Sequence, residues 1–307
     1  MHRSIPHQMP RPAITTDLAA TPASLAARAR AQSLRMLKGL VPQDSAIRLA
    51  NTDEAITAEH FAAALCRNCG AAREAAFCGE CGQKAVTRFG VGDLWQEIWQ
   101  QWRVFEKSIV HAAIRLMLQP GTVAREYVLG ARKRHVHPLT LLLFSVGALL
   151  VLLDRTGYLT SGQTDLQGAM KIVVAWSRWS FSLGLFAVIV ATWCVFRRRL
   201  GYNPVEHLVL AVYVQTLIVA ANALHLLPLL FLDTAHWVPL WRKAALWTMS
   251  PVEWAIVAMA CHQFFRLDWR TDAWRIALAL AGYVATKKLL LLAYGRVVLH
   301  AATGQVA

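Results

Sequence analysis

Apolar residues gather in long runs over the C-terminal two thirds of the chain, with short polar segments between them. The runs cover roughly residues 138–153, 174–196, 205–232, 248–265 and 276–299. A helix needs about 20 apolar residues to cross the hydrocarbon core of a bilayer. The pattern therefore predicts an all-α polytopic membrane protein, with about five transmembrane helices in a domain over residues 137–300.

The last apolar run can be interpreted in two ways, because Lys287 and Lys288 interrupt residues 276–299. One interpretation is a single span whose long lysine side chains reach toward the interface or are buried. The other is an amphipathic helix followed by a short span that begins near Leu289. Both interpretations remain open at this point.

Residues 92–136 come before the first span and carry apolar residues at steps of three or four, the period of a helix. Tryptophans on this stretch favour a water–lipid boundary. Pro120 and Gly121 separate it into two parts. We expect amphipathic juxtamembrane helices that either lie on the membrane surface or pack against the protein's own spans.

Charge is scarce but strongly positive. Only 16% of the 307 residues are charged, against about 25% in soluble domains, and the formal net charge is +14. Basic residues cluster at the ends of apolar runs, as at Arg132, Lys133 and Arg134. This placement is typical of topology signals or of contacts with anionic lipid headgroups, so we expect a lipid bilayer as the partner and no nucleic acid.

Residues 1–50 are rich in Ala, Arg and Pro and hold little that a core could bury, which predicts a disordered basic tail. The loops that follow alternate in their content of Lys and Arg. The richer loops lie on the side of the N-terminus, which predicts that the N-terminus faces the cytosol.

Four cysteines stand as two Cys-x-x-Cys pairs ahead of the helices: Cys66, Cys69, Cys78 and Cys81. Two such turns can complete a tetrahedral site of four thiolates, and zinc is its usual occupant, with iron as an alternative. Gly70 and Gly82 follow the pairs and permit the left-handed backbone that such turns require. Disulfides would need an oxidising compartment. We therefore predict a structural zinc ribbon over residues 62–86, with a possible protein partner.

The paired cysteines, followed by LQPGTVAREYVLGARKRHVHPLTLLLF, resemble a bacterial family of membrane proteins that contain a domain of unknown function. The resemblance covers roughly residues 66–155 and rests on Pro-Gly at 120–121, Arg-Glu-Tyr at 125–127 and Pro138, with EHLV at 206–209 further on. It implies an N-terminal zinc ribbon, a polytopic membrane body and the bacterial inner membrane. It implies no activity.

Ionisable residues within membrane spans suggest a function by default. Five fall within or near the third and fourth predicted spans: Glu206, His207, His225, Glu253 and His262. Antiparallel packing would bring the first two near His262, and His225 near Glu253. Such pairs could relay protons or hold a metal, or they could be ordinary hydrogen bonds between helices.

The chain carries no Gly-x-Ser-x-Gly, no P-loop and no His-Glu-x-x-His motif. We expect an inner-membrane protein without enzymatic activity whose cytosolic ribbon recruits or senses a partner. The alternative is a small transporter or channel-like protein that uses the polar residues of spans three and four, and a third hypothesis is a lipid-acting membrane enzyme. The sequence points to no substrate and no oligomeric state.

One prediction follows from the separation of ribbon and spans in the sequence. Cys66→Ser or Cys81→Ser should unfold the ribbon but leave the spans inserted, because helix insertion depends on apolar length and not on the metal. Membrane fractionation combined with limited proteolysis would show an intact membrane body with a cleaved ribbon. Loss of insertion in either variant would contradict independent folding.

Overall fold

The structure is a computed structural model that describes residues 55–62, 65–73, 75–90, 109–159 and 182–304. The chain divides into two units, residues 1–44 and 45–307, and all the described residues belong to the second. They form helices and no β-strand, apart from two isolated antiparallel bridges in the cysteine segment. The tail predicted over residues 1–50 lies outside the described residues.

Four helices in the described residues are long and apolar enough to cross a membrane, which identifies a polytopic membrane protein. They are α7 (Pro138–Arg155), α10 (Pro204–Leu226, extended by the 3-10 turn η4, Leu227–Leu230), α11 (Thr234–Phe264) and α12 (Ala273–Gly304). A shorter apolar helix, α9 (Leu183–Phe196), covers the end of the second predicted span. The beginning of that span, up to residue 181, lies outside the described residues.

Two boundaries differ from the sequence interpretation. Helix α11 begins at Thr234, far ahead of the predicted 248, and continues through Pro239 and Pro251. The polar residues and prolines of its first half concealed it from a search for apolar runs. Helix α12 is continuous from Ala273 to Gly304, so the single-span interpretation is confirmed over the two-segment one. Lys287 lies within it and pairs with Glu253 of α11.

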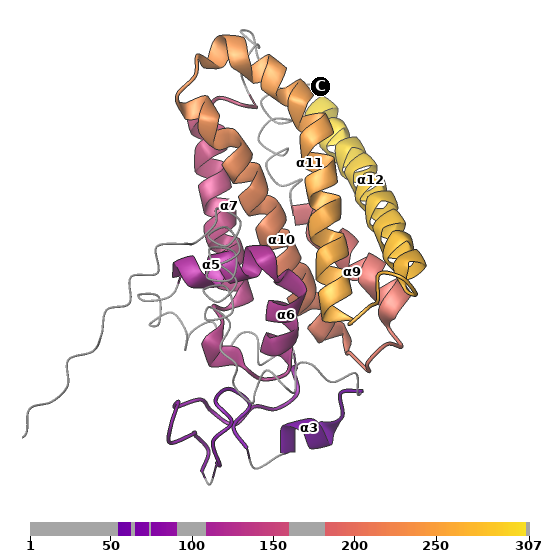
Figure 1. Cartoon of the computed structure of the whole chain (residues 1–307). Coiled ribbons are helices and arrows are strands. Elements are labelled where there is room, and N and C mark those ends of the chain that lie inside the picture. Colours follow the sequence, from indigo (N-terminus) through magenta and orange to yellow (C-terminus); the bar gives the residue numbers. More distant parts are fainter. Residues whose placement is uncertain (1–54, 63–64, 74, 91–108, 160–181, 305–307) are drawn as a thin grey trace, which may run out of the picture. The chain divides into compact units, whose positions relative to one another are not determined.

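Helix α10 is the central element of the membrane domain and packs against α7, α9 and α11 (Figure 1). Within its most apolar stretch 72% of the residues are buried, against 17–22% for the other three candidate spans. Those outer helices instead expose large apolar side chains, such as Phe144 of α7 and Leu292 of α12. An apolar outer face around a buried central helix is what a bilayer solvent favours.

Helix α10 begins with a capping box formed by Asn203 and Glu206. The Glu206 backbone N–H donates to Asn203 Oδ1 at 2.8 Å, and the Asn203 N–H donates to the Glu206 carboxylate at 2.7 Å. Pro204 occupies the first helical turn, where its missing N–H costs nothing. The sequence N-P-V-E therefore fixes where the central helix starts.

Two short helices precede the first span: α5 (Ile109–Leu118) and α6 (Pro120–Val128), followed by the 3-10 turn η2 (Arg132–Arg134). Every residue of α6 except Thr122 is buried, and α6 packs against α10 and α11 (Figure 1). The second juxtamembrane helix, α6, is therefore packed against the protein's own spans, while the two interpretations of the helix ahead of Pro120 stay predictions. Residues 91–108 lie outside the described residues.

Gly121 is where α6 approaches α11 most closely. A Cβ atom at this position would lie 2.2 Å from the Ala260 carbonyl oxygen and 2.6 Å from the Phe264 nitrogen. The same approach lets Gln263 Oε1 accept hydrogen bonds from the backbone N–H groups of Gly121, at 3.0 Å, and Thr122, at 3.4 Å. A side chain of α11 thus caps the N-terminus of α6.

We predict that Gly121→Ala destabilises the membrane domain by about 1–3 kcal/mol or more, because a backbone contact cannot yield as a flexible side chain can. Thermal unfolding in detergent would measure the loss. Gly147→Ala in α7 is the matched control, since nothing lies within 4 Å of its added Cβ, and it should be neutral or slightly stabilising. Equal stability of the two variants would contradict the close packing of α6 on α11.

Candidate metal centre and its attachment

The four predicted ligand atoms converge at one point. The Sγ atoms of Cys66, Cys69, Cys78 and Cys81 all lie within 4.8 Å of one another. The Sγ–Sγ distance is 3.6 Å for Cys66 and Cys81, and 3.5 Å for Cys69 and Cys78. In a tetrahedral zinc site with Zn–S bonds of about 2.3 Å, sulfur atoms lie about 3.8 Å apart. The cluster could therefore hold a metal ion.

The backbone around each pair of cysteines repeats the same turn. The Gly70 N–H donates to the Cys66 carbonyl, and the Gly82 N–H donates to the Cys78 carbonyl, both at 2.8 Å. Gly70 and Gly82 have φ angles of 80° and 66°, so the left-handed conformation predicted for them is confirmed. The two turns are equivalent halves of one site.

At Cys78 the backbone also stabilises the thiolate, which is the form of cysteine that binds metal, whereas burial raises the pKa of Cys69 to about 12. The hydrogen bond from the Cys81 backbone N–H lowers the pKa of Cys78 to about 7. Burial instead raises the pKa of the Cys66 thiol. A bound divalent cation would compensate this second effect, because it attracts the deprotonated form directly.

Gln83, which follows the second cysteine turn, binds the ribbon to the segment after α6, at Gly130 and at Lys133 of η2. Its Nε2 donates to the Gly130 carbonyl at 2.7 Å, and its Oε1 accepts from the Lys133 backbone N–H at 3.0 Å. The side chain is buried and its amide is satisfied at both ends. This pairing fixes the orientation of the ribbon on that segment.

The basic cluster Arg132, Lys133 and Arg134, predicted to mark topology or contact lipid headgroups, donates to the ribbon. Its acceptors are backbone carbonyls: Thr87 for Arg132 (2.9 Å), Cys81 for Lys133, and Asn68 for Arg134 (3.2 Å). Two of these acceptors are at or beside the cysteines, so the cations would also offset the negative charge of four thiolates bound to a metal. Their role toward lipid stays a prediction.

Arg125 attaches α6 to the membrane helices. Its side chain is 2% exposed and donates from Nη1 to the Tyr202 hydroxyl and, at 3.1 Å, to the Phe264 carbonyl at the end of α11. Tyr202 donates to the same carbonyl at 3.2 Å and stacks on the Phe264 ring. A buried guanidinium with these partners fixes α6, α11 and the start of α10 together.

Glu126, the next residue, is 3% exposed and has partners different from those of Arg125. Its carboxylate accepts from Arg115 of α5, at 2.7 and 3.0 Å, and lies 2.7 Å from His135 Nε2 after η2. Burial alone would raise the pKa of Glu126, but the hydrogen bond with His135 and the charge of Arg115 bring it below its usual value. The carboxylate is therefore charged and ties the elements on both sides of α6.

Tyr127 completes this arrangement with a fully buried ring. It stacks on Phe89, which follows the ribbon, and meets Tyr213 of α10 and His137 edge-on, at centroid distances of 5.6, 5.9 and 6.0 Å. The resemblance singled out Arg125, Glu126 and Tyr127 without a role. The structure gives them one, because the three consecutive side chains contact the segment after the ribbon, α5, α10, α11 and the residue that precedes α7.

Glu206 joins the same network. Its carboxylate forms an ion pair with Arg88, which comes after the ribbon, at 3.1 Å from Arg88 Nε to Oε1 and 3.2 Å from Nη2 to Oε2. The pairing with His262 expected from the sequence is not formed. The reason is that Glu206 belongs to the first turn of α10, where the capping box and the post-ribbon segment reach it.

The other predicted intramembrane residues also have separate surroundings. His207 contacts Thr192 Oγ1 at 3.1 Å, His225 lies against the Trp241 ring, Glu253 binds Lys287 and Tyr283, and His262 stacks on Trp269. His225 and Glu253 do not pair. In the described part of the chain, the cysteine cluster is the one group with the geometry of a metal site.

Comparison with known proteins gives one match. The model of a family described as "Protein of unknown function (DUF3667)" matches residues 106–149, the stretch of α5, α6, η2 and most of α7. The comparisons with curated proteins and with solved structures give no match. The chain is therefore similar to this family over α6 and its neighbours, and the matched stretch does not include the ribbon.

We predict that Glu126→Gln destabilises the protein by about 3 kcal/mol at neutral pH. The variant leaves the largely buried guanidinium of Arg115 without the carboxylate that neutralises its charge. Because the pKa of Glu126 is lower in the folded protein than the unfolded value of 4.5, its ionisation stabilises the fold at pH values above 4.5. This stabilisation is lost as the pH falls through the folded-state pKa. Thermal unfolding from pH 7 to pH 3.5 should show wild type and variant converging at low pH.

The control for this prediction is Glu80→Gln, which removes the same charge from an exposed position of the ribbon. It should change the unfolding temperature little at any pH. A difference between wild type and Glu126→Gln that stays constant down to pH 3.5 would refute a charged Glu126.

Proposed function

We propose that this chain is a non-enzymatic protein of the bacterial inner membrane whose cytosolic ribbon, closed by one structural zinc ion, recruits or senses a partner. The observation that carries the proposal is the convergence of four thiols in a segment that is bonded to the membrane domain through Gln83 and the 132–134 cluster. The metal, the ribbon and α6 then act as one unit.

A structural role for the metal follows from the donor set. Four cysteine ligands fill a tetrahedral zinc site and leave no position for water or substrate. Zinc also supplies the folding free energy that a segment of some 20 residues cannot obtain from a hydrophobic core. Catalysis at this centre is not part of the proposal.

The ribbon offers a partner an apolar surface. Leu65 and Phe77 begin its two isolated bridges and are 51% and 60% exposed. Large apolar side chains on a small polar module are a common feature of protein contact sites. The excess of Lys and Arg on the N-terminal side supports a cytosolic ribbon, where thiols stay reduced and available to metal.

The first test is the metal content of the detergent-purified full chain, measured by elemental analysis. We predict one zinc per chain in wild type and none when Cys66, Cys69, Cys78 and Cys81 are all replaced by Ser. Cys194→Ser removes an exposed cysteine outside the site and is the control; it should keep the metal. Absence of zinc from wild type, or metal remaining in the four-serine variant, would refute the assignment.

A second arm of this test addresses the partner. A photo-crosslinking amino acid at Phe77 should give a defined protein adduct in cells that make wild-type ligands, and no adduct in the four-serine background. The same crosslinker at Phe231, an exposed residue at the other end of α10, is the positional control. An identical adduct from all three proteins would exclude recognition by the folded ribbon.

A further inference from the structure

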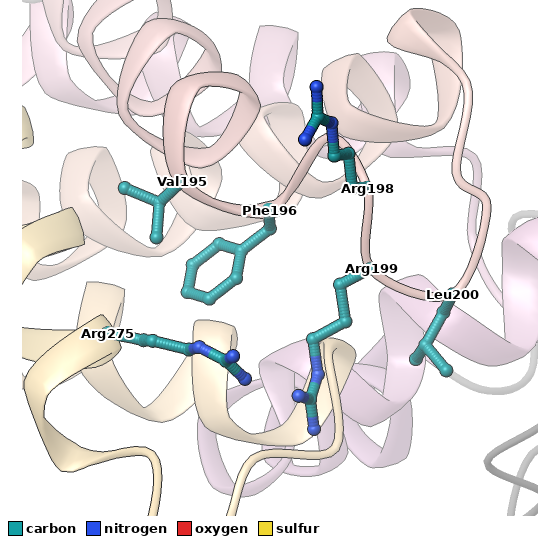
Figure 2. A pocket seen from close by; sticks show the side chains of 6 residues that line it. All are labelled: Val195, Phe196, Arg198, Arg199, Leu200 and Arg275. Atoms are coloured by element: carbon teal, nitrogen blue, oxygen red, sulfur yellow. The ribbon is translucent and has the colours of Figure 1, made fainter.

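A basic cavity lies where α9 ends and α12 begins, away from the ribbon's own contacts. It has a volume of about 500 Å³ and is shown in Figure 2. Its lining combines arginines with apolar side chains: Val195, Phe196, Arg198, Arg199, Leu200 and Arg275. The bias of Lys and Arg that predicts the membrane orientation explains why arginines lie in this loop. It does not explain why two of them line a cavity together with Arg275 of α12.

Two of the arginines are held in place by the protein. Arg199 donates from Nε to the Phe265 carbonyl at 2.9 Å, and Arg199 and Arg275 both bind Asp272, at 3.4 and 2.7 Å. Their guanidinium groups face one another across the cavity (Figure 2). Among the described residues Arg199 Nη1 and Arg275 Nη2 have no acceptor, so fixed donors remain for a ligand.

Arg198 supplies a third cation. It lines the cavity and is exposed, its guanidinium points away from those of Arg199 and Arg275 (Figure 2), and it forms no hydrogen bond or ion pair with any described residue, so it acts on an anion through its charge. Three guanidinium groups against the single carboxylate of Asp272 leave the cavity with a net charge of +2. Such an arrangement is favourable with an anion that can accept several N–H donors at once, and a phosphate group has that geometry.

The apolar part of the site indicates where the phosphate comes from. Phe196 ends α9 and α12 begins at Ala273, so the cavity lies at the ends of two apolar helices, at the level of lipid headgroups. Further along the same helices, Phe186 of α9 and Leu278 of α12 are exposed apolar side chains that an acyl chain can cover. A phospholipid satisfies both parts.

We propose that the cavity formed by Arg198, Arg199 and Arg275 binds the phosphate of an anionic phospholipid. The headgroup phosphate accepts hydrogen bonds from the unpaired guanidinium N–H groups, and the acyl chains lie along α9 and α12. The site joins the loop before α10 to the start of α12, and so bound lipid tightens the contact between α9 and α12. This site is separate from the basic cluster at 132–134, which donates to the carbonyls of Asn68, Cys81 and Thr87 in and just after the ribbon.

The test is a titration of the detergent-solubilised full chain with phosphatidylglycerol, followed by native mass spectrometry, with phosphatidylcholine as the neutral comparison. Arg198→Gln/Arg275→Gln should weaken phosphatidylglycerol binding about 25-fold, roughly fivefold for each arginine. Arg197→Gln/Arg270→Gln removes the same charge from two exposed positions outside the lining and should retain wild-type affinity. Arg198→Gln alone removes no hydrogen bond or ion pair to any residue that the structure describes, so its fivefold loss reports on binding and not on folding.

Equal weakening in both double variants would assign binding to general surface charge and overturn the proposal, as would wild-type affinity in the cavity variant. A parallel titration with glycerol 1-phosphate separates the sources of phosphate. If it binds as tightly as the lipid and depends on Arg198 in the same way, the ligand is a soluble phosphate and the assignment to lipid is wrong. Failure of zinc binding in the ribbon would leave this result unaffected, since the two sites share no residue.

Discussion

The burial of a charged pair on α6 is the constraint from which most of the architecture follows. Arg125 and Glu126 are consecutive, both nearly inaccessible to water, and they bind different sets of partners. A buried charge is tolerated only where the protein supplies its partners. Those partners come from α5, from the segment after η2, from the start of α10 and from the end of α11. Satisfying two neighbouring side chains therefore fixes the positions of four elements.

The ribbon is attached to this assembly through its backbone carbonyls and through the side chain of Gln83. The 132–134 cluster donates to the carbonyls of Asn68, Cys81 and Thr87, and the first two belong to the cysteine turns, whereas Gln83 binds Gly130 and Lys133 outside the ribbon. A metal ion bound by the four cysteines would act on the membrane domain by holding the ribbon in this folded shape. Loss of the ion would unfold the ribbon and so remove the acceptors of the three cations of the 132–134 cluster. Phe89, whose ring stacks on Tyr127, would then follow an unfolded segment.

The sequence was sufficient for the features that depend on short patterns. Apolar length predicted the spans of α7, α10 and α12, and the spacing of cysteines and glycines predicted a site whose geometry suits a metal. It failed where partners are distant along the chain. Glu206 was expected beside His262 because both end apolar runs, yet Arg88 binds it from 118 residues away. The start of α11 was missed because its first half is polar and carries proline, and the packing of Gly121 on Ala260 leaves no periodic signal.

The distances along the chain between these partners bear on how the protein is made. Arg125 is synthesised well before Tyr202 and Phe264, which lie 77 and 139 residues downstream. The ribbon, by contrast, finds Gly130 and Lys133 within about 50 residues of Gln83. The ribbon and η2 can thus assemble while the chain is still at the ribosome. The hydrogen bond from Arg125 to Phe264 forms only after nearly all the spans have been inserted. A chain that stops before Phe264 lacks one of the acceptors of Arg125 on α6, and intermediates with incomplete tertiary packing are prone to misfold.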